Sequence, residues 1–244
     1  MLRWLALAAL VAGCHDDAPK VAPAAPAAPA DWSYTSTDWA HGGYPECGGA
    51  IESPIAIDSQ QTLAAALPPL ELHYASAQAT VTDTGHTIVA KPAGANAIVV
   101  DGETLPLVQF HFHHASEHTI DGAGADLELH LVHQDARGHT VVVAILVKSG
   151  APHAELGKML DHLPTGSASA QIQIDPSAFL PADRRYFQYT GSLTAPPCTE
   201  GVDWLVLRAP IEVSPAQIAA FAARYPNNAR PLQPLDHRVV LASP

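Results

Sequence analysis

The sequence lacks several features that would assign it to common classes of protein. Its 244 residues contain no unbroken apolar run of about 18, the length that a membrane-spanning helix needs, so an integral membrane protein is not expected. Cations are scarce, because 12 Lys and Arg against 24 Asp and Glu give 12 − 24 = −12. So acidic a chain repels a phosphate backbone, which predicts no nucleic-acid partner. A His-Glu-x-x-His motif is also missing, which disfavours a standard zinc protease.

The residues that are present favour a folded protein rich in histidine. Hydrophobic residues make up 48% of the chain and charged residues only 15%, a balance that argues against a disordered chain. The length suits one large domain or two small ones. Histidine occurs 14 times, often in close succession, whereas cysteine occurs 3 times, an odd number. Both counts need an explanation from the positions of these residues.

The amino terminus is typical of a bacterial lipoprotein leader. Arg3 supplies a positive start, residues 4–11 form a short apolar core, and small residues precede Cys14. We predict a lipoprotein signal peptide over 1–13 and a lipidated Cys14 as the first mature residue. An ordinary signal peptide, with Cys14 incidental, is the alternative. Residues 14–30 are rich in Pro and Ala, which predicts an extended tether. The expected location is therefore the periplasm, with membrane contact only through the lipid anchor.

Two cysteines remain once Cys14 is set aside. In an exported protein, such a pair forms a disulfide by default. Cys47 and Cys198 are 198 − 47 = 151 residues apart, so a bridge between them would close a long loop. Two free buried thiols are the alternative.

Short β-rich runs separated by turn signals dominate residues 31–244, which predicts one sheet-dominated domain. Val141–Val147 is an unbroken apolar run, typical of a central strand covered on both faces. Helices are expected over Pro152–Leu163, from its apolar stripe, and over Ser214–Tyr225, which starts with a capping Ser followed by Pro. The other expected strands are Glu71–Tyr74, Gln78–Asp83, His86–Ala90, Ile98–Val100, Leu107–His113, Leu127–His133 and Val202–Arg208.

Two of these strands carry histidines on one face. Residues two apart on a strand share a face, so Gln109, His111 and His113 point in one direction. The opposite face is apolar and is expected to lie in a core: Val108, Phe110 and Phe112. Burying the polar face costs free energy unless each group finds a partner.

The strand over Leu127–His133 repeats the pattern with Glu128 and His130. If the two strands are neighbours, His111, His113 and His130 can meet at one point. Three imidazoles with an open fourth position are typical of a catalytic zinc site. Gln109 and Glu128 each precede a histidine by two residues, which suits them to accept a hydrogen bond from its other ring nitrogen. Ordinary hydrogen-bonded histidines of the core or surface are the alternative.

The same residues carry a resemblance to the α-class carbonic anhydrases. Motifs of that family occur here in its order, over almost the whole of 31–244: Gln-Phe-His-Phe-His at 109–113, Ser-Glu-His-Thr at 116–119, Glu-Leu-His-Leu-Val-His at 128–133, Gly-Ser-Leu-Thr-Ala-Pro-Pro-Cys at 191–198 and Arg-Pro-Leu-Gln-Pro-Leu at 230–235. The resemblance implies a mostly β (α+β) single domain. It would be built on a large, mainly antiparallel, twisted central sheet with a few short peripheral helices.

The resemblance also implies an enzyme. Its activity would be the zinc-dependent reversible hydration of carbon dioxide to bicarbonate and a proton, by attack of a zinc-bound hydroxide with a histidine proton shuttle. A catalytically weak zinc-binding or adhesive surface lipoprotein on the same scaffold is the alternative hypothesis. Bacterial members of the family are often dimers, so the resemblance suggests a homodimer.

Individual roles follow from the matched positions. The resemblance implies zinc ligands at His111, His113 and His130, held by Gln109, Glu128 and a backbone carbonyl near Asn228. It implies that Thr194 and Glu117 orient the hydroxide and that His86 shuttles protons. For His86 the alternative is an ordinary exposed histidine that follows a glycine turn. The remaining implied roles are an apolar carbon dioxide pocket of Val132, Val142, Leu193 and Trp204, a water contact at Tyr34, and a disulfide Cys47–Cys198 that braces the Thr194 loop.

Several positions depart from the family's pattern. Glu52 stands before Ser53-Pro54 where Gln is usual, and Thr84 and Val89 stand where amide side chains often line the active-site water. No ligand position is lost, but these changes predict fewer polar anchors between the metal and His86. The histidines without a matched role, His133 among them, are expected mostly at the surface.

Overall fold

The structure, a computed structural model, describes residues 31–164 and 168–244. The predicted signal peptide over 1–13 and tether over 14–30, with Cys14, lie outside the described residues. Within the described residues no helix combines the length and the apolar character that crossing a bilayer requires.

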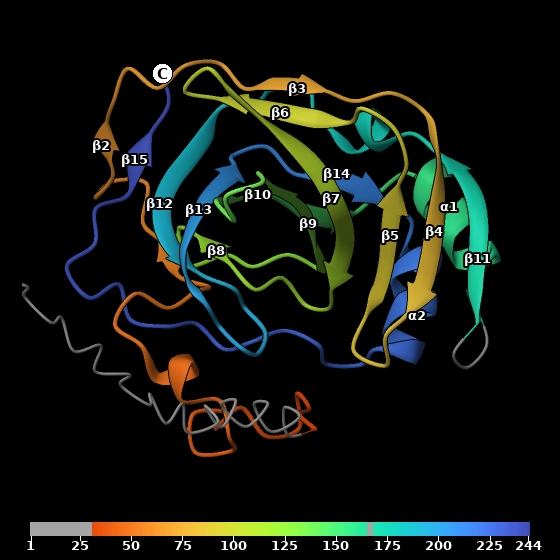
Figure 1. Ribbon diagram of the computed structural model, residues 1–244, viewed down its shortest axis with the longest axis horizontal. Coiled ribbons are helices and arrows are strands. Elements are labelled where there is room, and N and C mark those ends of the chain that lie inside the picture. The colour runs from red at the N-terminus through yellow and green to blue at the C-terminus, as the bar shows by residue number, and fades with distance from the viewer. Residues whose placement is uncertain (1–30, 165–167) are drawn as a thin grey trace, which may run out of the picture.

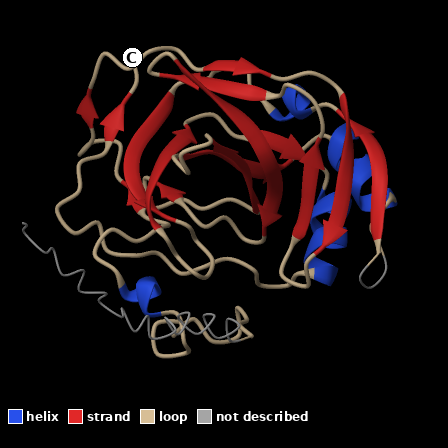
Figure 2. Ribbon diagram, viewed as in Figure 1, coloured by secondary structure: helices blue, strands red, loops and turns tan. Residues whose placement is uncertain are grey.

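Strands make up most of the secondary structure, as Figure 2 shows. In the described ranges the α-helices are α1 (Ala154–Asp161) and α2 (Pro215–Arg224), and the short 3-10 helices are η1 (Pro45–Gly48) and η2 (Pro176–Phe179). The strands are β1 (Ala56–Ile57), β2 (Leu63–Ala64), β3 (Glu71–His73), β4 (Ala77–Asp83), β5 (Ile88–Pro92), β6 (Ala97–Val100), β7 (Glu103–His113), β8 (Thr119–Ile120), β9 (Leu127–Gln134), β10 (Thr140–Ser149), β11 (Ser169–Ile174), β12 (Tyr186–Ser192), β13 (Glu200–Leu207), β14 (Ile211–Val213) and β15 (Leu241–Ala242).

One large twisted sheet organises the domain (Figure 1). Its main path runs β11-β4-β5-β7-β9-β10-β13-β12-β15-β2. The prediction of a mostly β domain with short peripheral helices is confirmed. The sheet is nevertheless mixed, because β10 pairs with β13 and β14 in parallel. A parallel pair needs a long crossover connection, and here α1, β11, η2 and β12 lie between β10 and β13 in the chain.

Both faces of the central strand β10 are buried, as its apolar run predicted. Val141, Val143, Ile145 and Val147 belong to the larger hydrophobic cluster, which includes Met159 of α1 and Phe221 of α2. Val142 and Ala144 point to the other face and belong to a second cluster with residues of β12 and β13. The helices therefore cover one face of the sheet, and the second face is left to carry the polar residues of β7 and β9.

The ends of the predicted elements shift by a few residues, and some elements were missed. His86 lies in the turn before β5, so the predicted strand start at His86 is wrong. The helix predicted over Ser214–Tyr225 is confirmed as α2, with Ser214 and Gln217 forming a capping box. Strands β11 and β12 were not predicted, although Ile172 and Ile174 alternate with exposed residues in β11. Alternation over six residues is a weak signal when polar side chains occupy the other face.

The prediction that Val108 belongs to the core face is also wrong, because its side chain is 44% exposed. The pairing of β7 with β9 shifts register between Leu107 and Gln109. Such a bulge inserts one extra residue into a strand and changes the face to which the preceding side chains point. Beyond it, Phe110 and Phe112 are fully buried, as predicted.

His133, expected at the surface, is instead fully buried. It follows Leu127, Leu129 and Leu131 at two-residue spacing and therefore points into the same core. Its Nδ1 lies 3.2 Å from the carbonyl oxygen of Val141, and its Nε2 lies 2.7 Å from the hydroxyl of Tyr74. Burial lowers the pKa of His133 to about 4, although the backbone contact partly opposes the shift.

This shift predicts a loss of stability in acid. Below pH ~6.5 the unfolded chain takes up a proton at residue 133 that the folded chain accepts only near pH 4. Stability therefore falls as the pH drops from 6.5 to 4, by about 3 kcal/mol from this residue. The measurement is urea unfolding at pH 7 and at pH 5. Between these two pH values, we expect the free energy of unfolding of His133→Gln to fall by about 2 kcal/mol less than that of the unmodified chain. Equal losses in both proteins would contradict the assignment.

Candidate metal centre and active site

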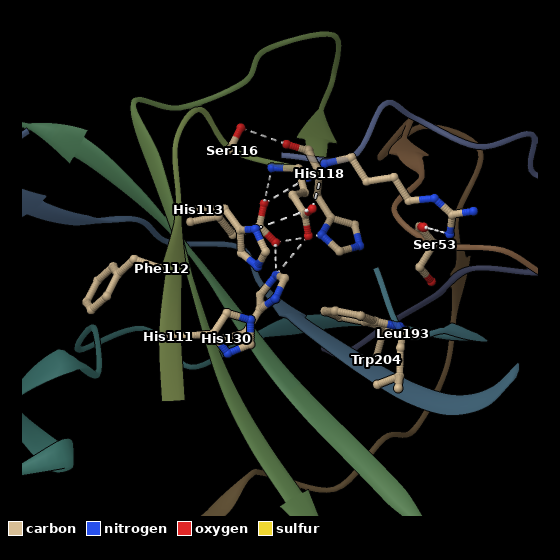
Figure 3. A network of polar contacts seen from close by, with 12 residues as sticks. Ser53, His111, Phe112, His113, Ser116, His118, His130, Leu193 and Trp204 are labelled. Carbon is tan, nitrogen blue, oxygen red and sulfur yellow. Dashed lines mark hydrogen bonds and ion pairs between the residues drawn. The ribbon is translucent and has the colours of Figure 1, made fainter. Parts of the chain in front are cut away.

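The three predicted ligand histidines meet on the second face of the sheet. Strands β7 and β9 are antiparallel neighbours, with His111 directly opposite His130 and His113 opposite Glu128. Nitrogen atoms of His111, His113 and His130 all lie within 4.8 Å of one another. Figure 3 shows the three rings turned toward one another. The alternation of residues on two strands, paired in this register, thus brings these side chains together.

Each of these rings has one nitrogen that faces the other two histidines and a second nitrogen that makes a hydrogen bond. The three contacts are His111 Nδ1 to Gln109 Oε1 at 2.9 Å, His113 Nδ1 to the backbone oxygen of Asn228 at 2.7 Å, and His130 Nε2 to Glu128 Oε1 at 2.8 Å. The ring N–H donates in each, because all three partners are oxygen acceptors. The lone pairs that remain free lie on His111 Nε2, His113 Nε2 and His130 Nδ1. Gln109, Glu128 and Asn228 therefore occupy the positions predicted for them.

The donor set fits a zinc ion. His113 Nε2 is buried and has no hydrogen-bond partner, an arrangement that costs free energy unless a cation takes up the lone pair. Burial lowers the pKa of His113 to about 4 and that of His111 well below its ordinary value. Three neutral imidazoles with free lone pairs are a typical ligand set of a catalytic zinc site.

Glu128 orients more than one neighbour. Its Oε1 accepts from His130 and, at 2.6 Å, from His118 Nδ1, while its Oε2 accepts the backbone N–H groups of Glu117 and His118. Burial alone would raise the pKa of Glu128, but His118 and His130 hold it well below its ordinary value. His118, Glu128 and His130 also lie close enough to hold a metal, but hydrogen bonds already join them. This second group is therefore a hydrogen-bonded support for the first.

Glu117 and Thr194 lie beside the histidines and are both buried. Glu117 Oε1 accepts the backbone N–H of Arg230 at 2.8 Å and lies 3.4 Å from His113 Nδ1. Burial raises the pKa of Glu117 to about 7, whereas the Arg230 N–H and the Thr194 hydroxyl lower it. Glu117 Oε2 is buried and has no hydrogen-bond partner in the described part of the chain. The structure brings this predicted pair together.

An apolar wall borders the histidines. Val132, Val142 and Trp204 form one row across β9, β10 and β13, because Val142 is opposite both other residues. Leu193 packs against the same hydrophobic cluster. The Trp204 ring lies 4.9 Å from the ring of His130. The four residues predicted for a carbon dioxide pocket are thus grouped next to His130.

His86 lies among aromatic side chains of the N-terminal segment. Its ring stacks on Trp32, with the ring centres 3.8 Å apart and the planes 6° apart. Tyr34 meets the His86 ring edge-on at 6.4 Å. Burial raises the pKa of Tyr34, so its hydroxyl stays protonated near neutral pH. Stacking on Trp32 was not anticipated, because no local sequence signal connects residues 32 and 86.

Cys47 and Cys198 form a disulfide. It joins η1 to the loop that follows Thr194, and both sulfur atoms lie in a small buried cluster with Trp39 and Tyr44. The Cys198 N–H donates to the Ala195 carbonyl at 2.9 Å, so the loop is also closed by its own backbone. The bridge therefore fixes the loop four residues beyond Thr194.

Sequence reasoning assigned no role to Arg230, although its backbone N–H donates to Glu117. It is 4% exposed, and its guanidinium donates to Glu52 Oε2 at 2.6 Å and to the backbone oxygens of Ser53 and Cys47. The unusual Glu52 is thus paired inside the protein. A buried arginine needs such a partner, and its place in the matched 230–235 motif was the available signal.

Comparisons with known proteins show the family of the chain. The sequence model of the family described as "Eukaryotic-type carbonic anhydrase" matches residues 34–244. A carbonic anhydrase of Klebsiella pneumoniae is 42% identical over 205 residues, which are 81% of this chain and 82% of that protein. The α-carbonic anhydrase of Thermovibrio ammonificans, solved with the inhibitor sulfanilamide, has a TM-score of 0.83 at 38% identity, covering 87% of this chain and 99% of the other. The α-carbonic anhydrase of Photobacterium profundum has a TM-score of 0.82 at 39% identity, covering 86% of this chain and 100% of the other.

A mostly β domain with three convergent histidines beside an apolar wall defines a class of zinc-site enzymes. The chain belongs to the α-class carbonic anhydrase family.

Proposed function

We propose that this chain binds Zn²⁺ through His111, His113 and His130 and catalyses the reversible hydration of carbon dioxide to bicarbonate and a proton. The observation that carries the proposal is the meeting of three oriented imidazoles, whose nitrogens lie within 4.8 Å of one another, beside the Trp204 wall. Zinc supplies Lewis acidity, which makes water a nucleophile near neutral pH. The remaining steps belong to residues of the chain.

Thr194 and Glu117 orient the attacking oxygen. When Glu117 is ionised it only accepts hydrogen bonds. In the proposed mechanism, the Thr194 hydroxyl donates a hydrogen bond to Glu117 Oε2, which has no other partner in the described part of the chain. The lone pairs of the Thr194 oxygen are then left to accept a hydrogen bond. A nucleophile that carries a hydrogen is favoured at this position, and anions without one are disfavoured.

The apolar wall receives the substrate. Carbon dioxide has no charge and no hydrogen to donate, so Val132, Val142, Leu193 and Trp204 offer it a surface that water leaves readily. The same surface gives bicarbonate, an anion, little stabilisation. The product is therefore expected to leave in exchange for water.

His86 carries the proton to the buffer. An imidazole can both take up and release a proton, which suits it to act as a general acid and base. We expect His86→Ala to reduce turnover about 100-fold or more in dilute buffer, because a positioned proton-transfer group typically contributes about 10²- to 10⁴-fold. Added imidazole should restore most of the rate, because a small base can replace the missing side chain. Turnover that is independent of buffer in both proteins would remove the shuttle assignment.

The alternative is a zinc-binding or adhesive protein without catalysis. All three ligand positions are occupied by histidine, which favours the enzyme. The test is stopped-flow hydration of carbon dioxide by the purified chain, before and after zinc is removed with a chelator and restored. We expect activity that follows the zinc content. A full complement of zinc with no hydration would establish the alternative.

We also propose that the chain is exported and anchored by lipid on Cys14. The leader-like residues 1–13 and the disulfide, which forms in oxidising compartments, support export. Metabolic labelling with palmitate should mark the unmodified chain and not Cys14→Ser. Labelling that persists in the variant would contradict the anchor. The suggested homodimer remains a prediction, which sedimentation of the purified chain would check.

A further inference from the structure

Asn228 makes five hydrogen bonds with other described residues. It follows α2 and is 2% exposed. Its backbone N–H donates to the His114 carbonyl at 3.1 Å, and its backbone oxygen accepts from His113 Nδ1 at 2.7 Å. The backbone of Asn228 is thus attached to the end of β7 at two consecutive residues.

The side chain of Asn228 extends this contact to the turn that carries His86. Its Oδ1 accepts the His114 N–H at 2.7 Å. Its Nδ2 donates to the Phe112 carbonyl at 3.1 Å and to the His86 carbonyl at 3.0 Å. Both amide hydrogens and the amide oxygen are therefore used, and none of these bonds could be kept by an apolar side chain.

These contacts lie where the sheet no longer joins the two segments. The pairing of β5 with β7 consists of Val89 opposite His111 and Ala90 opposite Phe110. His86 and His113 both lie beyond this ladder. The side chain of Thr87 crosses the same gap and donates to the Phe112 carbonyl at 2.6 Å. Among the described residues, it makes no hydrogen bond to His86 or His113. Asn228 is the residue that reaches both.

We propose that the Asn228 side chain is a positioning residue that couples the proton-shuttle turn to the metal site. It would fix the backbone of His86 relative to the end of β7 and, through the same residue, the orientation of His113. The inference rests on the proposed function and adds to it a residue that touches neither the metal nor the substrate. Its action is exerted through His86 and His113.

The test compares Asn228→Ala with Asn96→Ala. Asn96 is 5% exposed and uses its side chain in the same way, accepting from the Ala75 N–H at 2.8 Å and donating to the Ala93 carbonyl at 3.3 Å. It lies outside the site and controls for the loss of a buried asparagine. In Asn228→Ala the backbone oxygen that accepts from His113 remains, so the variant reports on the side chain alone.

We expect both variants to unfold more readily and only Asn228→Ala to change the site. Zinc release to a chelator should become about tenfold faster or more, as for other groups that orient metal ligands. Turnover in dilute buffer should fall more than kcat/KM does, and imidazole should restore part of the difference. If Asn228→Ala matches Asn96→Ala in zinc release and buffer dependence, the side chain is structural only and the proposal is overturned.

A second measurement covers the case in which Asn228→Ala does not fold. In the unmodified chain, the two Asn228 amide protons should exchange slowly with solvent, and their NMR signals should move both on zinc loading and in His86→Ala. Signals that respond to neither change would overturn the coupling. A chain that binds zinc but does not hydrate carbon dioxide would refute the proposed function, while zinc release and the amide signals would still decide the role of Asn228.

Discussion

Replacing His111 with alanine is expected to abolish stoichiometric zinc binding and carbon dioxide hydration together. Two imidazoles are too few for a stable zinc site, for which three protein ligands are the usual minimum in enzymes. The ring of His111 is only partly buried, whereas His113 and His130 are almost fully buried. Its removal should therefore disturb the fold less than loss of either partner. Zinc content by mass spectrometry and stopped-flow hydration provide the measurements.

A matched control is Gln109→Ala, which leaves all three ligands and removes only the acceptor of the His111 N–H. Loss of such an outer partner typically weakens metal affinity or activity 10- to 100-fold. We expect this partial loss in Gln109→Ala and a much larger one in His111→Ala. Full zinc content and full turnover in His111→Ala would show that His111 is not a ligand.

Replacing both bridge cysteines with serine is expected to destabilise the folded chain by about 4–5 kcal/mol. The bridge between Cys47 and Cys198 has a sequence separation of 151. In the chain-entropy model, closing so long a loop lowers the entropy of the unfolded state and raises its free energy by that amount. The variant should also lose activity, because the bridge holds the loop that carries Thr194. Urea unfolding of Cys47→Ser/Cys198→Ser gives the free energy.

The control is the unmodified chain unfolded with its disulfide reduced, which should lose a similar amount. A loss below about 1 kcal/mol in the double variant would mean that the bridge contributes little. Loss of stability without any loss of hydration would show that the Thr194 loop keeps its place without the bridge.

Much of the candidate site was predictable because it depends on local alternation along two strands. Side chains two residues apart share a face, so His111 and His113 had to point together, and Glu128 and His130 likewise. The only long-range assumption was that the two strands are neighbours. The same rule, carried to the end of β9, places His133 in the core with Leu129 and Leu131, which is where the structure has it.

Contacts between segments far apart in the sequence were not predictable in this way. The pairing of Arg230 with Glu52, the stacking of Trp32 on His86 and the side-chain bonds of Asn228 to His86 join residues up to 178 positions apart. No periodicity marks such pairs. The bulge that exposes Val108 and the parallel pairing of β10 with β13 are likewise set by packing of the whole sheet rather than by local pattern.

The claim on which the account depends is that one metal ion lies between three particular nitrogen atoms. A crystal structure of the zinc-loaded chain, with data collected at the zinc absorption edge, tests it directly. We predict one anomalous peak about 2.0–2.1 Å from Nε2 of His111, Nε2 of His113 and Nδ1 of His130, with a solvent molecule as the fourth ligand. A zinc peak elsewhere, or a protein side chain in the fourth position, would contradict the account.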